Sequence, residues 1–85
     1  MVITEVIWTQ KFEHEFKKIK DSSTKEKLKK QIAKIVSNPK FGKPLRYGLK
    51  GELTVYVKPY RLIYSIFGNK LYLLRFEHRD EVYGR

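Results

Sequence analysis

Cysteine is absent from the 85-residue sequence, and histidine occurs only at His14 and His78. Without cysteine there is no disulfide, no thiolate nucleophile and no cysteine-based zinc site. Apolar runs fall short of the roughly 18–20 residues that span a bilayer, and the start MVITEVIW lacks the pattern of a signal peptide. We therefore predict a cytoplasmic protein with no metal, no cofactor and no membrane partner.

Negative charge is scarce, because 9 Asp and Glu oppose 19 Lys and Arg and give a formal net charge of +10. The chain is nevertheless 41% hydrophobic and 14% aromatic, which excludes a disordered basic tail. A length of 85 residues leaves room for one core, so residues 1–85 are predicted to form a single domain. The excess of positive charge indicates an anionic partner such as nucleic acid or an acidic protein.

The two kinds of cation are separated along the chain. All eleven basic residues within residues 1–43 are Lys, whereas residues 44–85 hold all five Arg and all six Tyr. Lysine is a hydrated point charge, while the planar arginine fork can grip a phosphate through two hydrogen bonds. A phosphate site is therefore expected in the second half, although most of the lysines are expected simply to form solvated helix faces.

The first half of the chain predicts one strand and two helices. Residues 2–8 are rich in β-branched side chains, and Thr9 can cap a helix that carries an apolar stripe. Ser23 and Glu26 have the spacing of a capping box, so a second helix is predicted to start at Ser23. This helix is expected to end at Asn38-Pro39, because the residue before proline avoids the helical conformation.

The second half predicts a connector over residues 38–51 and then three strands. Apolar and polar residues alternate from Leu53 to Val57, and Gly68-Asn69 is a hairpin signal between strands at 60–67 and 70–77. The alternation in the last two strands is imperfect, as expected for strands contacted on both faces. The predicted fold is α+β, with a helical hairpin on one face of an antiparallel meander and the other face open.

Few residues remain that could carry chemistry. The sequence has no Gly-rich phosphate loop, no Ser-His-Asp arrangement and no cluster of metal ligands. Arginines can stabilise a phosphorane, and an imidazole, a phenol or an amine can transfer protons, which suits metal-free RNA cleavage by the ribose 2′-hydroxyl. The candidate catalytic residues are Lys58, Arg61, His78, Arg79 and Tyr83. The candidate RNA-contacting residues are Arg46, Lys50, Tyr56 and Arg85.

Three short motifs resemble those of the RelE/ParE superfamily of toxins. They are LKG at residues 49–51, YRLIY at residues 60–64 and HRxxVY at residues 78–83. The preceding strand and helical hairpin also match that superfamily in order and length, so the resemblance covers essentially the whole chain. It implies a toxin of a type II toxin–antitoxin pair.

The resemblance also implies an activity and site residues. RelE-like members are ribosome-dependent, metal-free mRNA endonucleases, and by similarity Arg61 grips the scissile phosphate. Arg79 would be the second phosphate-stabilising arginine, Tyr83 would stack or transfer a proton, and His78 would serve as the base. The implied partners are the ribosome, its mRNA and a cognate antitoxin that covers basic surface with an acidic or amphipathic helix.

One departure from the family pattern leaves alternatives open. Thr54 and Tyr56 stand where many relatives carry two basic residues, and Lys50 and Lys58 are the candidates to replace that charge. The loss of the basic pair favours a ParE-like toxin that inhibits DNA gyrase without nuclease activity. A catalytically inactive RNA-binding relative is a third possibility.

The candidate residues also have purely structural interpretations. Arg61 could be a strand arginine paired with Glu52 or Glu77, since arginines away from solvent are usually paired. Tyr83 could dock its ring on the sheet, and His78 could be a solvent-facing residue at the end of a strand.

Overall fold

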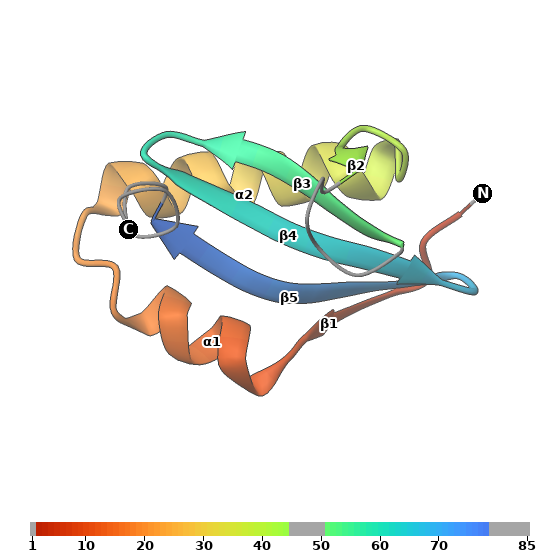
Figure 1. Cartoon of the computed structure of the whole chain (residues 1–85), viewed down its shortest axis with the longest axis horizontal. Helices are drawn as coiled ribbons and strands as arrows, with labels where there is room; N and C mark the ends of the chain where they lie inside the picture. Colours follow the sequence, from red (N-terminus) through yellow and green to blue (C-terminus); the bar gives the residue numbers. More distant parts are fainter. Residues whose placement is uncertain (1, 45–50, 79–85) are drawn as a thin grey trace.

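The computed structural model describes residues 2–44 and 51–78, and Figure 1 shows how the elements are arranged. In chain order the elements are β1 (Glu5–Trp8), α1 (Gln10–Lys17), α2 (Ser22–Ser37), β2 (Lys43–Pro44), β3 (Glu52–Val57), β4 (Tyr60–Phe67) and β5 (Lys70–His78). The predicted α+β class and the order of strand, two helices and meander are confirmed. No helix within the two described ranges is long and apolar enough to cross a membrane.

The strands join one sheet in the order β1-β5-β4-β3-β2. β3, β4 and β5 form the predicted antiparallel meander, and β1 adds to β5 in parallel, with Glu5 opposite Lys70. The connector predicted over residues 38–51 also contains a strand that the sequence analysis missed. This strand, β2, pairs with Leu53 and Thr54 at the edge of the sheet, where its proline is tolerated because no further strand needs the missing N–H.

Thr9 begins α1 as predicted and also attaches this helix to the sheet. Its Oγ1 accepts a hydrogen bond from the Phe12 N–H at 3.3 Å, which satisfies one of the unpaired donors in the first turn. The same hydroxyl donates to the Leu73 carbonyl of β5 at 2.6 Å. The direction of α1 along β5 is therefore fixed at its first residue (Figure 1).

The predicted start of α2 at Ser23 is corrected by the structure. Asp21 is the N-cap, and its Oδ1 accepts from the Ser23 N–H at 3.1 Å while Oδ2 accepts from the Thr24 hydroxyl at 2.8 Å. These hydrogen bonds, the one from Thr24 first, lower the pKa of Asp21. A carboxylate at this position also interacts favourably with the positive end of the helix dipole. An uncharged serine at position 23 would not have this interaction.

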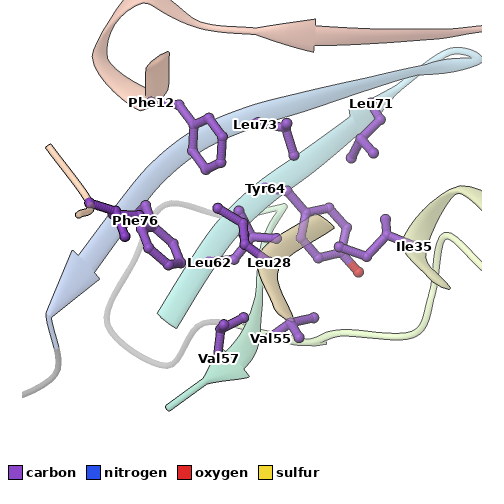
Figure 2. Packing of buried hydrophobic residues seen from close by; sticks show 11 residues of the cluster. Phe12, Leu28, Ile35, Val55, Val57, Leu62, Tyr64, Leu71, Leu73 and Phe76 are labelled. Atoms are coloured by element: carbon purple, nitrogen blue, oxygen red, sulfur yellow. The ribbon is translucent and has the colours of Figure 1, made fainter. Parts of the chain in front are cut away.

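The core lies between one face of the sheet and both helices, as Figure 2 shows. α1 contributes to it beside β5, and α2 contributes beside β3. The apolar residues of the alternation predicted for β3 face the helices, and the last two of them are Val55 and Val57. The buried cluster consists of Phe12, Ile19, Leu28, Ile35, Val55, Val57, Leu62, Tyr64, Leu71, Leu73 and Phe76.

A β-bulge in β5 explains the imperfect alternation of the last strand. Tyr64 pairs with Leu73 but Ile63 pairs with Arg75, so Leu74 is an extra residue without a partner in β4. The buried residues of β5 therefore change from odd positions to the even position of Phe76. Burial on both faces does explain β4, where the consecutive residues Leu62, Ile63 and Tyr64 are all fully buried, but in β5 the alternation changes because its phase shifts at the bulge.

Candidate functional site

Four of the nine residues singled out by the sequence lie in the described part of the chain. Arg61 lies in β4 opposite Tyr56 of β3, Lys58 lies in the exposed turn between these strands, and His78 ends β5. The other five lie outside the described residues, and their roles stay predictions: Arg46, Lys50, Arg79, Tyr83 and Arg85.

Arg61 faces a carboxylate on the neighbouring strand. The register of β4 and β5 puts Glu77 directly opposite Arg61, and Arg61 Nη2 lies 3.7 Å from Glu77 Oε1. The two side chains are only 17% and 28% exposed. The structural interpretation of Arg61 as a paired strand arginine is thus confirmed for Glu77. A guanidinium beside a carboxylate attracts a phosphate less strongly, because opposite charges cancel at a distance.

Arg75 extends this ion pair into a network of two arginines and two glutamates. Its Nη1 and Nη2 donate to the two carboxylate oxygens of Glu52 at 3.1 and 2.7 Å, and its Nε lies 3.5 Å from Glu77 Oε2. Glu52 is buried, and its hydrogen bonds raise the pKa of Arg75. The formal charges of the four side chains sum to zero, so the network is structurally tight and electrically balanced.

The sheet face opposite the helices is therefore not the open cationic surface that the sequence predicts. Ile63 alternates with the core residues Leu62 and Tyr64, so it belongs to this opposite face, yet it is fully buried. Glu52 is buried on the same face, with Arg75 against it. The correction has a simple cause, because the arginines counted as free cations have carboxylates beside them.

His78 lies on the other side of the sheet from Arg61. Its ring contacts Tyr60 edge-on at a centroid distance of 5.2 Å, and Tyr60 stacks on the core residue Phe76 at 4.7 Å. These three rings line a recess of about 250 Å³ together with Glu15 of α1, which accepts a hydrogen bond from the Phe76 N–H at 2.9 Å. The structure thus separates the imidazole from the arginine with which it was expected to act.

A groove runs along the outer edge of β3, and we call it the β3-edge groove. Its volume is about 520 Å³, and two aromatic side chains in it are conspicuously exposed, Phe41 at 41% and Tyr56 at 50%. Lys43 and Arg61 bring positive charge, and no carboxylate belongs to the part of the lining that the structure describes. The described lining residues are Gln31, Phe41, Gly42, Lys43, Thr54, Val55, Tyr56 and Arg61.

Tyr64 fixes the chain segment that forms one wall of this groove. Its hydroxyl accepts from the Gly42 N–H at 2.8 Å and donates to the Pro39 carbonyl at 3.0 Å. A Cβ at Gly42 would lie 2.6 Å from the Tyr64 oxygen and 2.9 Å from the Thr54 carbonyl, so only glycine permits this approach. Burial raises the pKa of Tyr64, which keeps the hydroxyl protonated and able to donate.

Nowhere in residues 2–44 and 51–78 do three or more His, Asp or Glu side chains gather in a group that could hold a metal ion. Phe41, Gly42 and Lys43 line the groove but were not predicted as site residues, because they lie in the segment assigned as a connector. The sequence signal for this part of the site was an aromatic residue directly before a glycine, because a glycine marks a place where another backbone or a ligand approaches closely.

Comparisons with known proteins give one family match and one similar fold. A family model described as "ParE toxin of type II toxin-antitoxin system, parDE" matches residues 6–83. A solved structure titled "Chromosomal ParDE TA system from P. aeruginosa" is similar with a TM-score of 0.69, over 89% of this chain and 96% of that chain. The sequence identity is 15%, so this similarity shows the fold alone. No curated protein sequence matches the chain.

Proposed function

Because this chain belongs to the ParE toxin family of type II toxin–antitoxin systems, we propose that it inhibits DNA gyrase by binding it and does not cut RNA. The family match is the observation that carries the proposal, because it spans residues 6–83. The sequence alone favours mRNA cleavage over gyrase inhibition, and the family match favours the reverse order.

The geometry of the described candidate residues supports the absence of nuclease activity. Metal-free cleavage needs a proton acceptor and a cation at the same phosphate. Arg61 has Glu77 at 3.7 Å, and His78 faces Glu15 and Tyr60 on the other side of the sheet. A toxin that acts by contact needs neither group to be catalytic.

The partners follow from the same proposal. A toxin of a ParDE pair has a cognate antitoxin, and the target would be gyrase in place of the ribosome and mRNA. The net charge of +10 suits both, since it speeds encounter with acidic protein surfaces and with the DNA that gyrase holds.

Two assays on one preparation test the proposal. Added to gyrase, relaxed plasmid and ATP, the purified chain is expected to block supercoiling or to accumulate cleaved plasmid. Added to programmed ribosomes, it is expected to leave the mRNA intact.

The opposite pattern would overturn the proposal. The nuclease reading would stand if mRNA were cut, if Arg61→Ala reduced cleavage by more than tenfold, and if Lys70→Ala did not. Lys70 is the matched control, because it is an exposed cation at the start of β5 and forms a 3.7 Å ion pair with Glu5 of the edge strand β1.

A further inference from the structure

We infer that the outer face of α2 binds the phosphate backbone of duplex DNA through three lysines, which we call the α2 lysine row: Lys27, Lys30 and Lys34. The source of the DNA rests on the proposed function, because gyrase works on a DNA duplex. The location and the chemistry of the site rest on the helix itself.

The row follows from the period of the helix. Residues three and four apart share one side of an α-helix, so Lys27, Lys30 and Lys34 stand in line. All three are exposed, and the exposed residues Ser23 and Ser37 extend the line by about one turn at each end. The buried residues of α2 lie on another side of the helix, which packs toward the sheet. The row is therefore turned to solvent.

Neighbouring carboxylates do not cancel the charge of the row. α2 holds five Lys and a single Glu, Glu26, while Asp21 precedes the helix and accepts two hydrogen bonds from its first turn. Among the residues that the structure describes, the ion pairs lie in the sheet, at Arg61, Arg75 and Lys70, and none includes a lysine of α2. A polyanion that neutralises the row would release its own condensed counterions, which favours binding.

Composition favours a nucleic-acid backbone over a protein as the occupant. Interfaces between proteins bury an apolar centre and are poor in lysine. Contacts to nucleic-acid phosphates are commonly made by lysine and serine side chains. Apart from its lysines, the exposed residues of α2 are Ser22, Ser23, Glu26, Ala33 and Ser37.

The row also suits a duplex better than a single strand. At 1.5 Å per residue, Lys27 and Lys34 lie about 10 Å apart along the helix axis, which is the rise of roughly three nucleotides in one strand of a duplex. Binding of a single strand relies on aromatic side chains that stack on the bases, and α2 contains none. Because phosphates carry no sequence information, we expect binding without a preferred base sequence.

The first test measures binding of the purified chain to a labelled twenty-four-base-pair DNA duplex by fluorescence anisotropy, without gyrase or antitoxin. Lys27→Gln with Lys30→Gln is expected to weaken binding at least about tenfold in low salt. The slope of log affinity against log salt is expected to fall by about two, one for each lost phosphate contact. Lys34 is left unchanged, because its Nζ also lies 5.8 Å from the centre of the Phe41 ring and its loss would have two effects.

Lys11→Gln with Lys17→Gln is the matched control. Both lysines are exposed on α1, and this pair of changes also lowers the net charge from +10 to +8. The control is expected to bind within about twofold of the natural chain, with an unchanged salt slope, because α1 lies apart from α2 (Figure 1). Equal losses in the two double variants would show that net charge alone attracts DNA, and would overturn the inference.

A charge-conserving variant separates loss of charge from damage to the helix. Lys27→Arg with Lys30→Arg is expected to bind the duplex as tightly as the natural chain, because both cations are kept. A tenfold loss in this variant would overturn the inference.

Competing ligands test the choice of occupant. A single-stranded oligothymidylate and an RNA duplex of the same length are expected to displace the labelled DNA duplex less effectively than unlabelled DNA duplex does. Tighter binding of either would overturn the inference. So would a Lys27→Gln, Lys30→Gln variant that keeps its affinity for duplex DNA but loses affinity for the antitoxin.

The outcomes separate this inference from the proposed function. If duplex binding depends on the α2 lysine row but gyrase supercoils normally in the presence of the chain, the gyrase target is wrong and the DNA site stands. If gyrase is inhibited but duplex binding is unchanged in the Lys27→Gln, Lys30→Gln variant, the DNA site is wrong and the proposed function stands.

Discussion

Glu52 is a charged residue that the fold buries to 7% exposure, and Arg75 makes this possible. Two hydrogen bonds of 2.7 and 3.1 Å join the guanidinium to both carboxylate oxygens. A buried carboxylate without such a partner costs several kcal/mol, so the two side chains depend on each other. The sequence named Glu52 only as a possible partner of Arg61, because composition does not reveal which arginine of a sheet reaches which glutamate.

Glu52→Gln is expected to lower the free energy of unfolding by about 1.5–3 kcal/mol, the range for losing a hydrogen bond between charged groups. Urea denaturation at neutral pH measures the loss. Glu5→Gln is the control, because Glu5 and Lys70 form an ion pair at 3.7 Å with both side chains more than half exposed. That change is expected to cost about 1 kcal/mol or less. Equal losses in the two variants would contradict the role assigned to Glu52.

At the scale of elements, the β5 bulge decides which side chains meet. Phe67 pairs with Lys70 at the hairpin, and regular pairing counted back from there would put Phe76 opposite Arg61. The bulge moves the register by one residue, so Glu77 stands opposite Arg61 instead. The pairing that balances the charge of Arg61 could not be predicted, because a bulge leaves only an interruption of alternation in the sequence.

Elements defined by local signals were predictable. Thr9 caps α1, Asn38-Pro39 ends α2, and the alternation of Leu53 to Val57 gives β3 its core face. Features that need a distant partner were not. β2 exists only because Lys43 and Pro44 lie against β3, and the strand β1, which was predicted, has its place in the sheet only because it pairs with β5 more than sixty residues later.

The start of α2 gives a prediction at this scale. Asp21→Ala is expected to lower the melting temperature at pH 7, because the Ser23 N–H and the Thr24 hydroxyl lose their acceptor. The pKa of Asp21 is lowered in the folded chain. Its contribution is therefore fully present above the unfolded carboxyl pKa of about 3.9 and disappears as the pH falls through the lower folded pKa.

Melting curves from pH 7 to pH 2 check both parts of this prediction. Natural chain and variant should differ most near neutrality and converge in acid. Ser23→Ala is the control, because the Ser23 backbone N–H is the donor and remains in place. A larger effect of Ser23→Ala than of Asp21→Ala would show that Ser23 is the N-cap, as predicted from the sequence.

For the whole molecule, the sequence predicted the fold class and the excess of positive charge but not how that charge is used. The lysines of the first half lie mostly on exposed helix surface, as expected. Arg61 of the second half was expected to grip a phosphate and instead stands beside Glu77, and Arg75 stands beside Glu52. The surplus that remains for a partner is therefore largely lysine.

The excess of positive charge also affects the stability of the fold. The longest dimension of the molecule is 35 Å, and the Debye length is about 30 Å at 0.01 M salt, so the cations repel one another across the whole fold. Raising NaCl from about 0.01 to 0.3 M, where the Debye length shrinks below about 10 Å, is expected to raise the melting temperature. Each kcal/mol gained corresponds to about 4–8 °C in a domain of this size.

A double variant controls for general effects of salt. Lys29→Glu with Lys30→Glu lowers the net charge from +10 to +6, since each exchange changes it by two. The salt dependence of its melting temperature should be clearly weaker than that of the natural chain. An unchanged dependence would show that charge repulsion is not its cause.

Leu74, the extra residue of the bulge, has a consequence for how chains of this family can differ in length. Arg75 and Glu77 point away from the helices and Phe76 points toward them because the bulge takes up one residue without a partner. Deleting Leu74 would leave a regular strand with every later side chain on the face it now occupies. A one-residue gap at this position in an alignment is thus structurally neutral, whereas the same gap two residues later would exchange core and surface.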